Sequence, residues 1–181
     1  MKTKSIMEET MQALSTKQNV TSKTTTESWR RVAWILMLIA DVGLLAWAAM
    51  AAIAPEHLIG PGSAPILKAG YEGFTGNSWS ELAGTSPVTT GFMTLLFRMY
   101  GIYGVAFSLM AIAIAVTAFR RGDGWAWWAL LVGNTLTYVS AMRYDWTVKA
   151  IGPFELTEYL GLAAIYFALV VTVPWKRNVT E

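Results

Sequence analysis

The feature that most constrains this chain is a series of long apolar stretches that carry few charges. They cover residues 32–54, 90–119, 125–142 and 154–175. A helix of roughly 20 residues crosses the hydrocarbon core of a bilayer, whereas the strands of membrane barrels are short and alternate in polarity. These stretches are apolar on every face. The sequence therefore predicts an all-α integral membrane four-helix bundle, with an outer Pro/Gly-rich loop that contains short helices.

The composition agrees with a membrane protein and excludes several kinds of chemistry. Of the 181 residues, 54% are hydrophobic and 14% are charged, against about 25% charged in soluble domains. The chain has no cysteine, which removes thiolate metal sites and cysteine nucleophiles, and its single histidine, His57, cannot supply a bis-histidine haem. We therefore expect no metal site and no cofactor, assign no catalytic residue, and favour a protein that is not an enzyme.

The distribution of lysine and arginine predicts the orientation of the chain. With the N-terminus in the cytoplasm, the 14 basic residues divide into ten on the inner side and four on the outer side. Basic pairs border three inner helix ends: Arg30 and Arg31, Arg120 and Arg121, and Lys176 and Arg177. By the positive-inside rule, we expect a multi-pass protein of the plasma (inner) membrane with both termini in the cytoplasm.

The remaining segments at the two ends are polar. Residues 1–31 are rich in Thr, Ser, Lys, Gln and Glu, which predicts a mobile cytoplasmic tail, and residues 178–181 form a second tail beyond the membrane domain, residues 32–177. A cleaved signal peptide is the weaker interpretation of residues 32–54. This run exceeds the apolar core of a signal peptide, about 7 to 15 residues, and Pro55 follows it.

The outer loop, residues 55–89, holds four of the six prolines of the chain. This composition is typical of compact irregular structure. Ser78 with Glu81 three residues later forms a capping box, which predicts a short helix around residues 79–83. Ser86 followed by Pro87 predicts the start of the next helix, which continues to the end of the second apolar stretch.

Small residues indicate how the helices pack. They recur at helical spacing in the second stretch (Gly104, Ser108, Ala111 and Ala115) and in the third (Ala129, Gly133, Thr137 and Ala141). Such ladders let a second helix approach closely. Packing within one bundle and formation of a homodimer both explain them.

Four polar side chains are expected at one depth inside the bundle. Counted at 1.5 Å per residue, they lie ~14 to 17 Å from the inner helix ends. They are Asp41, Ser108, Asn134 and Tyr166. A carboxyl without a cation at this depth is expected to be neutral and to donate to Asn134 or Tyr166. It serves either as a ligand-binding or proton-binding group or as part of a network that fixes the helix register.

A second polar layer is expected near the outer helix ends. Its charged members come from three helices and are Arg98, Arg143, Glu155 and Glu158, with Tyr100, Tyr138 and Tyr159 around them. The layer is interpreted either as a polar entrance for a lipid headgroup or small amphiphile, or as an ion-pair network that seals the bundle. In both cases Arg98 is predicted to pair with Glu158 or Glu155 across the helices.

One part of the chain resembles a known group of proteins. Its marks are Thr75-Gly76, Ser78-Trp79, Pro87, Arg98 with Gly101 and Gly104, and the junction Phe119-Arg120-Arg121-Gly122 followed by Trp125-Ala126-Trp127-Trp128-Ala129-Leu130. This pattern, over roughly residues 74–135, resembles small four-helix membrane proteins that are loosely DoxX-like. Some DoxX-like proteins are subunits of quinone-linked membrane oxidoreductases, so the resemblance implies an accessory or lipophile-handling role.

Three functional classes remain. The favoured one is a non-catalytic accessory subunit or lipophile-binding module, with membrane lipids and a membrane-complex partner or second copy as its partners. The alternatives are a small proton-coupled transporter that acts as a dimer through Asp41, and an intramembrane enzyme that acts on a lipid or quinone. No nucleic-acid partner is expected, because Arg120 and Arg121 are too few for a basic patch.

The predicted orientation is testable by cysteine labelling, because the native chain has no cysteine. An impermeant thiol reagent added to intact cells is expected to label Ser78→Cys in the outer loop and to leave Asp123→Cys in the inner turn unlabelled. Labelling of Asp123→Cys alone would reverse the orientation.

Overall fold

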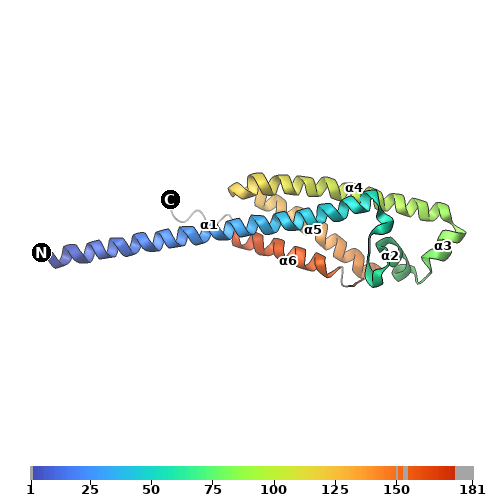
Figure 1. Ribbon diagram of the computed structural model, residues 1–181, viewed down its shortest axis with the longest axis horizontal. Coiled ribbons are helices and arrows are strands. Elements are labelled where there is room, and N and C mark those ends of the chain that lie inside the picture. The colour runs from blue at the N-terminus through green and yellow to red at the C-terminus, as the bar shows by residue number, and fades with distance from the viewer. Residues whose placement is uncertain (1, 150, 153–154, 174–181) are drawn as a thin grey trace.

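The computed structural model describes residues 2–149, 151–152 and 155–173, and in this part of the chain the fold is all-helical (Figure 1). The long helices are α1 (Lys2–Ile53), α4 (Pro87–Ile114), α5 (Gly124–Val148) and α6 (Leu156–Val171). The all-α prediction is therefore confirmed for the described residues. The predicted inner border at Trp175, Lys176 and Arg177 and the tail at residues 178–181 lie outside them.

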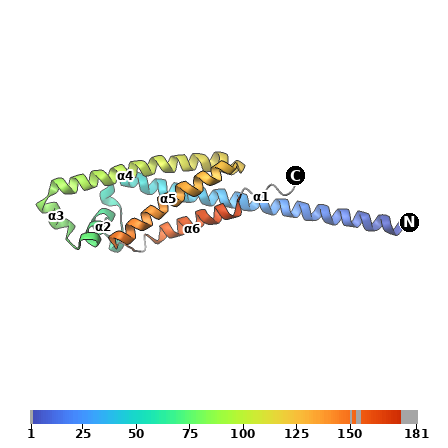
Figure 2. The same cartoon turned by 180° about the vertical axis from the view of Figure 1, so that it is seen from behind.

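Helix α1 is longer than the apolar stretch from which it was predicted. It begins at Lys2 and runs unbroken to Ile53, so the expected tail, residues 1–31, is helical from Lys2 on. Figures 1 and 2 show this first part of α1 projecting beyond the other helices. The difference has a local cause: these residues include no proline or glycine, so nothing interrupts the hydrogen-bond ladder that the apolar half propagates.

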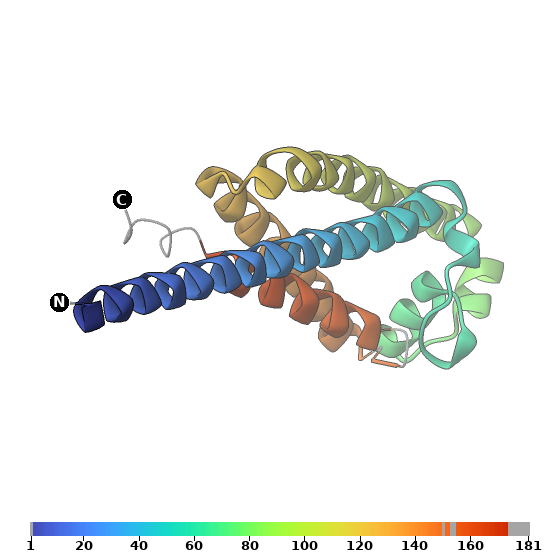
Figure 3. The ribbon, with the colours of Figure 1, turned by 60° about the vertical axis from the view of Figure 1, so that its left-hand side comes forward.

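The most extensive contact between two helices of the described residues is the antiparallel seam between α1 and α4, which converge at the C-terminal end of α1 in Figure 3. A Cβ atom placed on Gly101 would lie 2.4 Å from the backbone nitrogen of Ala52, and one on Gly104 would lie 2.8 Å from the Cβ atom of Ala48. Real Cβ atoms do not come this close to other atoms, so glycine is required at both positions. The predicted small-residue ladder of the second stretch thus packs within one chain, against α1.

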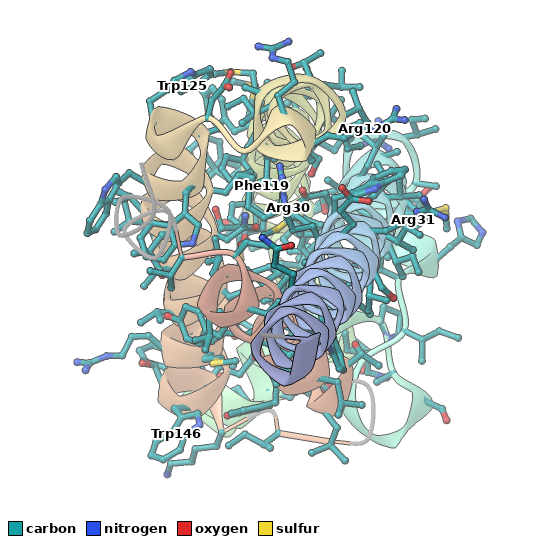
Figure 4. The ribbon with its side chains drawn as sticks, turned by 90° about the vertical axis from the view of Figure 1, so that its left-hand side faces the viewer. Arg30, Arg31, Phe119, Arg120, Trp125 and Trp146 are labelled. Atoms are coloured by element: carbon teal, nitrogen blue, oxygen red, sulfur yellow. The ribbon has the colours of Figure 1, made fainter. Side chains whose placement is uncertain are left out.

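The inner end of the fold is built from the turn between α4 and α5. Helix α4 ends in a π-helical turn, η3 (Ala115–Phe119), and Gly122 takes a positive φ of 86° before α5 begins. Arg120 stacks on the ring of Trp34, 5.2 Å from its centre, and the guanidinium of Arg30 donates to the carbonyl oxygen of Arg120. Figure 4 shows Arg30 and Arg120 close together in the view along α1. Two of the predicted basic pairs therefore meet at one end of the molecule.

The outer loop contains two 3₁₀ turns, η1 (Pro55–His57) and η2 (Pro61–Ser63), and two short helices, α2 (Ile66–Thr75) and α3 (Trp79–Thr85). The predicted short helix is confirmed with Ser78 as its N-cap, because Ser78 Oγ accepts from the backbone N–H of Glu81 at 3.5 Å. The predicted helix start at Pro87 is confirmed as well. Helix α2 covers the outer end of α5: Gly70 leaves room for the hydroxyl of Tyr144, and Gly73 for the carbonyl of Val148.

Two helical segments are long and apolar enough to cross a membrane, Glu27–Ile53 and Pro87–Phe119. The prediction of four spans is thus met in part. Helix α6 is apolar but has only 16 residues. Helix α5 is long enough, but it includes three tryptophans near its start and the polar Asn134. The two matching segments are mostly unburied, in contrast to the core helices of soluble proteins.

The seam between α1 and α4 makes a prediction with a matched control on the same helix. Gly101→Ala is expected to destabilise the protein by about 1 to 3 kcal/mol, because the added methyl group meets backbone that cannot move aside cheaply. Gly91→Ala, with no atom within 4 Å of its Cβ position, is expected to leave stability unchanged or to raise it. Thermal unfolding of both variants in detergent measures this difference. Equal behaviour of the two variants would contradict the packing of the seam.

Candidate functional site

Three of the four predicted midplane residues form a fully buried polar layer. Asp41, Ser108 and Asn134 each have an exposed fraction of 0% and come from α1, α4 and α5. The register that sets Gly104 against Ala48 places Ser108 next to Leu44, within one turn of Asp41. The amide nitrogen of Asn134 lies 3.9 Å from the sulfur of Met37, one turn from Asp41 on the other side. We call these three residues the inner layer.

The hydrogen bonds of the inner layer differ from the prediction. The amide of Asn134 donates to the carbonyl oxygen of Leu130 on its own helix, and the hydroxyl of Tyr166 pairs with that of Thr135 at 3.0 Å. The prediction that Asp41 donates to Asn134 or Tyr166 is therefore wrong, because neither carboxyl oxygen of Asp41 has a hydrogen-bond partner in the described residues, while the amide nitrogen of Asn134 and the hydroxyl of Tyr166 bond to groups on α5. Both carboxyl oxygens of Asp41, Ser108 Oγ and Asn134 Oδ1 are buried without a hydrogen-bond partner in the described part of the chain.

The predicted pairing of Arg98 with Glu158 or Glu155 is also wrong. The guanidinium of Arg98 lies 3.6 Å from the carboxylate of Glu56, in the turn that follows α1, and both side chains are about half exposed. Within the described residues, Arg143 is exposed and forms no ion pair. The long arginine side chain turns toward the aqueous loop because its charge is better solvated there than between helices. The two predicted cations therefore leave the outer carboxyls unneutralised.

The outer polar layer is instead a cluster of three carboxyls, Asp145, Glu155 and Glu158, which we call the acid cluster. Glu155 is 4% exposed and accepts from the backbone N–H of Gly152 at 2.8 Å. The carboxyls of Asp145 and Glu158 interact electrostatically, and one oxygen of each, Asp145 Oδ2 and Glu158 Oε2, is buried without a hydrogen-bond partner in the described residues. Burial raises the pKa of Asp145 to about 6, with a further rise from the charge of Glu155.

Asp145 was missed in the sequence because it follows Arg143 beyond the apolar stretch 125–142. A signal was present, since Asn134, Tyr138 and Asp145 follow one another at spacings of four and seven residues and so share one face of α5. This face turns inward: Asn134 and Tyr138 are both buried. Extending this helix face beyond the end of the apolar stretch at residue 142 leads to Asp145, the third carboxyl of the cluster.

The predicted tyrosines divide between the cluster and its surroundings. Tyr138 is 7% exposed, and its hydroxyl lies 3.1 Å from the position of a Cβ atom on Gly161 of α6. Tyr100 lies within electrostatic reach of Asp145 and Glu158 and packs edge-on against Trp47. The hydroxyl of Tyr159, in contrast, accepts from the indole N–H of the exposed Trp146 at 2.8 Å. Tyr138 and Tyr100 therefore belong to the site, and Tyr159 lies at its outer rim.

The arrangement offers hydrogen-bond acceptors and exchangeable protons rather than positive charge. An anionic headgroup is disfavoured at the acid cluster, because its three carboxyls lack a cation among the described residues. No group of three or more Asp, Glu or His side chains in the described part is placed to hold a metal ion. The predicted entrance for a lipid headgroup or small amphiphile thus lacks the basic side chains that would bind an anionic headgroup.

Comparison of the chain with protein-family models, with curated proteins and with solved structures finds no match. The DoxX-like resemblance therefore stays a prediction.

The raised pKa of Asp145 predicts a pH dependence of stability. The folded protein binds this proton more tightly than the unfolded chain, whose aspartate has a pKa of 3.8, so the contribution of Asp145 to stability falls as the pH rises from about 4 to about 6. Asp145→Asn is expected to remove this fall. The melting temperature in detergent between pH 4 and pH 8 measures it, with Glu81→Gln on the exposed face of α3 as the control. Parallel curves for the wild type and Asp145→Asn would contradict the buried pair.

Proposed function

We propose that the protein is a four-span integral membrane protein of the plasma membrane, with both termini in the cytoplasm. Apolar side chains on the outward faces of all the long helices support this. Their exposed fractions lie between 54% and 70% for Ile39 of α1, Leu109 and Met110 of α4, Leu136 of α5, and Leu160 and Val170 of α6. Soluble proteins rarely expose so continuous an apolar surface, whereas lipid tails solvate it well.

Within this membrane domain, we propose a non-catalytic role in which the protein binds a lipophilic molecule, alone or as an accessory subunit of a membrane complex. The observation that carries the proposal is the inner layer, whose acceptors lack donors inside an apolar bundle. Binding sites for apolar ligands combine apolar walls with a few polar groups that fix orientation. Unpaired buried acceptors favour a ligand whose head donates hydrogen bonds, because such a head removes their desolvation penalty.

A second unpaired group refines the kind of ligand. The indole N–H of Trp47 is buried without an acceptor, six residues beyond Asp41 on α1, a rise of ~9 Å. Six residues also turn the helix by about 600°, so Trp47 lies on a different face of α1 from Asp41, and a head bound at the inner layer needs hydrogen-bond donors alone. Hydroquinones and other phenolic or alcoholic amphiphiles have this chemistry.

The alternatives depend on other features. A proton-coupled transporter that acts as a dimer through Asp41 is favoured by the neighbouring carboxyls of Asp145 and Glu158, each of which has one buried oxygen without a hydrogen-bond partner in the described residues. An intramembrane enzyme acting on a lipid or quinone would use Asp41 or Glu158 as its acid or base. No observation in the described residues favours the enzyme over the binding module.

The binding proposal is tested with decyl-ubiquinol and its oxidised quinone under anaerobic conditions. The quinol carries two hydroxyl donors and the quinone none, so the quinol is expected to raise the melting temperature in detergent and the quinone to raise it less. At 100 times its dissociation constant, a ligand stabilises by about 2.7 kcal/mol.

The control is Asp41→Leu. Leucine branches at Cγ like aspartate, and Asp41 has no hydrogen bond to lose, so this variant is expected to fold with wild-type or higher stability while the shift caused by the quinol disappears. A shift that persists in Asp41→Leu would place the quinol elsewhere. If the quinol causes no shift and a mild-detergent pull-down recovers a stoichiometric protein partner, lipophile binding is contradicted and the role as an accessory subunit remains.

A further inference from the structure

The acid cluster and the inner layer are joined by a single face of α5. Tyr138 lies one turn outward from Asn134 and two turns inward from Asp145. Its hydroxyl packs against Gly161, which is one turn inward from Glu158 on α6. Tyr138 is also within electrostatic reach of both Asp41 and Glu158. The side chain of Tyr138 therefore stands between the two acidic sites.

The two halves of the helix assembly differ in polarity. The apolar core lies in the inner half, where Met37, Phe119, Trp127, Leu130 and Leu169 are buried together and the indole of Trp127 donates to the carbonyl of Leu169. The outer half contains Tyr138, Glu158 and Asp145 along the same axis. A proton on Asp41 is thus sealed from the inner side, and beyond the inner layer itself it meets ionisable groups toward the outer side.

We propose that Asp145 and Glu158 form an outward-facing proton-binding pair that exchanges a proton with Asp41 through the hydroxyl of Tyr138. The acid cluster does not carry this by itself. The independent observation is Asp41, which is fully buried on another helix with both oxygens unpartnered. A buried carboxyl without a hydrogen bond needs either a proton or a donor, and Tyr138 is a buried hydroxyl group that interacts electrostatically with both Asp41 and Glu158.

The transfer is a balanced exchange of protons with no movement of electrons. Glu158 gives its carboxyl proton to the hydroxyl oxygen of Tyr138, while that hydroxyl gives its own proton to a carboxylate oxygen of Asp41. Glu158 is left as a carboxylate, to which Asp145 or the aqueous phase returns a proton, and Asp41 becomes a neutral acid. No hydrogen bond joins Tyr138 to either acid in the described structure, so the path is closed at rest and opens when these side chains move.

The groups that surround the outer pair set its charge. They are Tyr100 of α4, Tyr144 of α5 and Glu155 before α6. Among the described residues, no ion pair reaches Asp145 or Glu158 from the basic residues of the outer half, which are Lys68, Arg98, Arg143 and Lys149. No fixed cation among the described residues therefore competes with a proton for the two carboxyls. We call this proton transfer through Tyr138 the relay. It goes beyond lipophile binding and does not depend on it.

The experiment measures hydrogen–deuterium exchange at Asp41 in lipid vesicles near pH 5, with infrared spectroscopy as the readout. The carboxylic C=O band that is lost in Asp41→Asn reports the Asp41 proton and shifts when deuterium replaces it. Tyr138→Phe removes one hydroxyl and keeps the ring against Gly161. It is expected to slow exchange at Asp41 by about 100-fold, the lower range for a positioned proton-transfer group. Glu158→Gln is expected to slow it as well.

The matched control is Tyr159→Phe, which removes a hydroxyl from the outer rim that bonds to Trp146 instead of the pair. It is expected to exchange at the wild-type rate. Wild-type exchange in Tyr138→Phe, or no C=O band attributable to Asp41, would overturn the relay. Circular dichroism of each variant establishes that the helices are intact, and the response to the quinol, measured separately, shows whether lipophile binding survives when the relay fails.

Discussion

The structure depends first on the close contact between α1 and α4. Gly101 and Gly104 let the backbone of α4 approach that of α1 at Ala48, Ala51 and Ala52 closely enough to leave no room for a Cβ atom. In a membrane, such contacts are stabilised by dispersion between backbones, since lipid tails remove the hydrophobic drive for association. This contact fixes the depth and rotation of α1, and the positions of Asp41 and Ser108 follow from it.

Close packing also explains why the inner layer is unpaired. At the seam the helices approach too closely for long polar side chains to reach across, and Asn134 and Tyr166 find partners on α5. The acceptors of Asp41 and Ser108 are left without donors as a result. A buried group of this kind reduces stability by about 1 to 3 kcal/mol, and this energetic cost is what the proposed binding role would offset.

The sequence predicted the polar layers at the right levels but not their partners. Depth follows from counting residues along a helix, and Asp41, Ser108 and Asn134 are buried as expected. Pairing depends on rotation and on the reach of side chains, which counting does not supply. Arg98 shows the difference: its level matched the outer acids, yet its guanidinium pairs with Glu56 in the loop. Asp145 was missed for the opposite reason, because it lies past the apolar stretch although its helix face points inward.

What the sequence determined by itself is the set of helices, the capped start of α3 and the proline at the start of α4, because these depend on local hydrogen bonding and on apolar composition. The helical continuation of α1 through its polar first residues was not predicted, since helix length there depends on propagation from the packed half. Only the tertiary structure decided that Asp145 and Glu158 interact, each with one buried oxygen that lacks a partner in the described residues, and that Tyr138 stands between them and Asp41. The physical reason is that these contacts join residues on different helices, whose relative rotation is set by the packing of small residues and not by any local pattern.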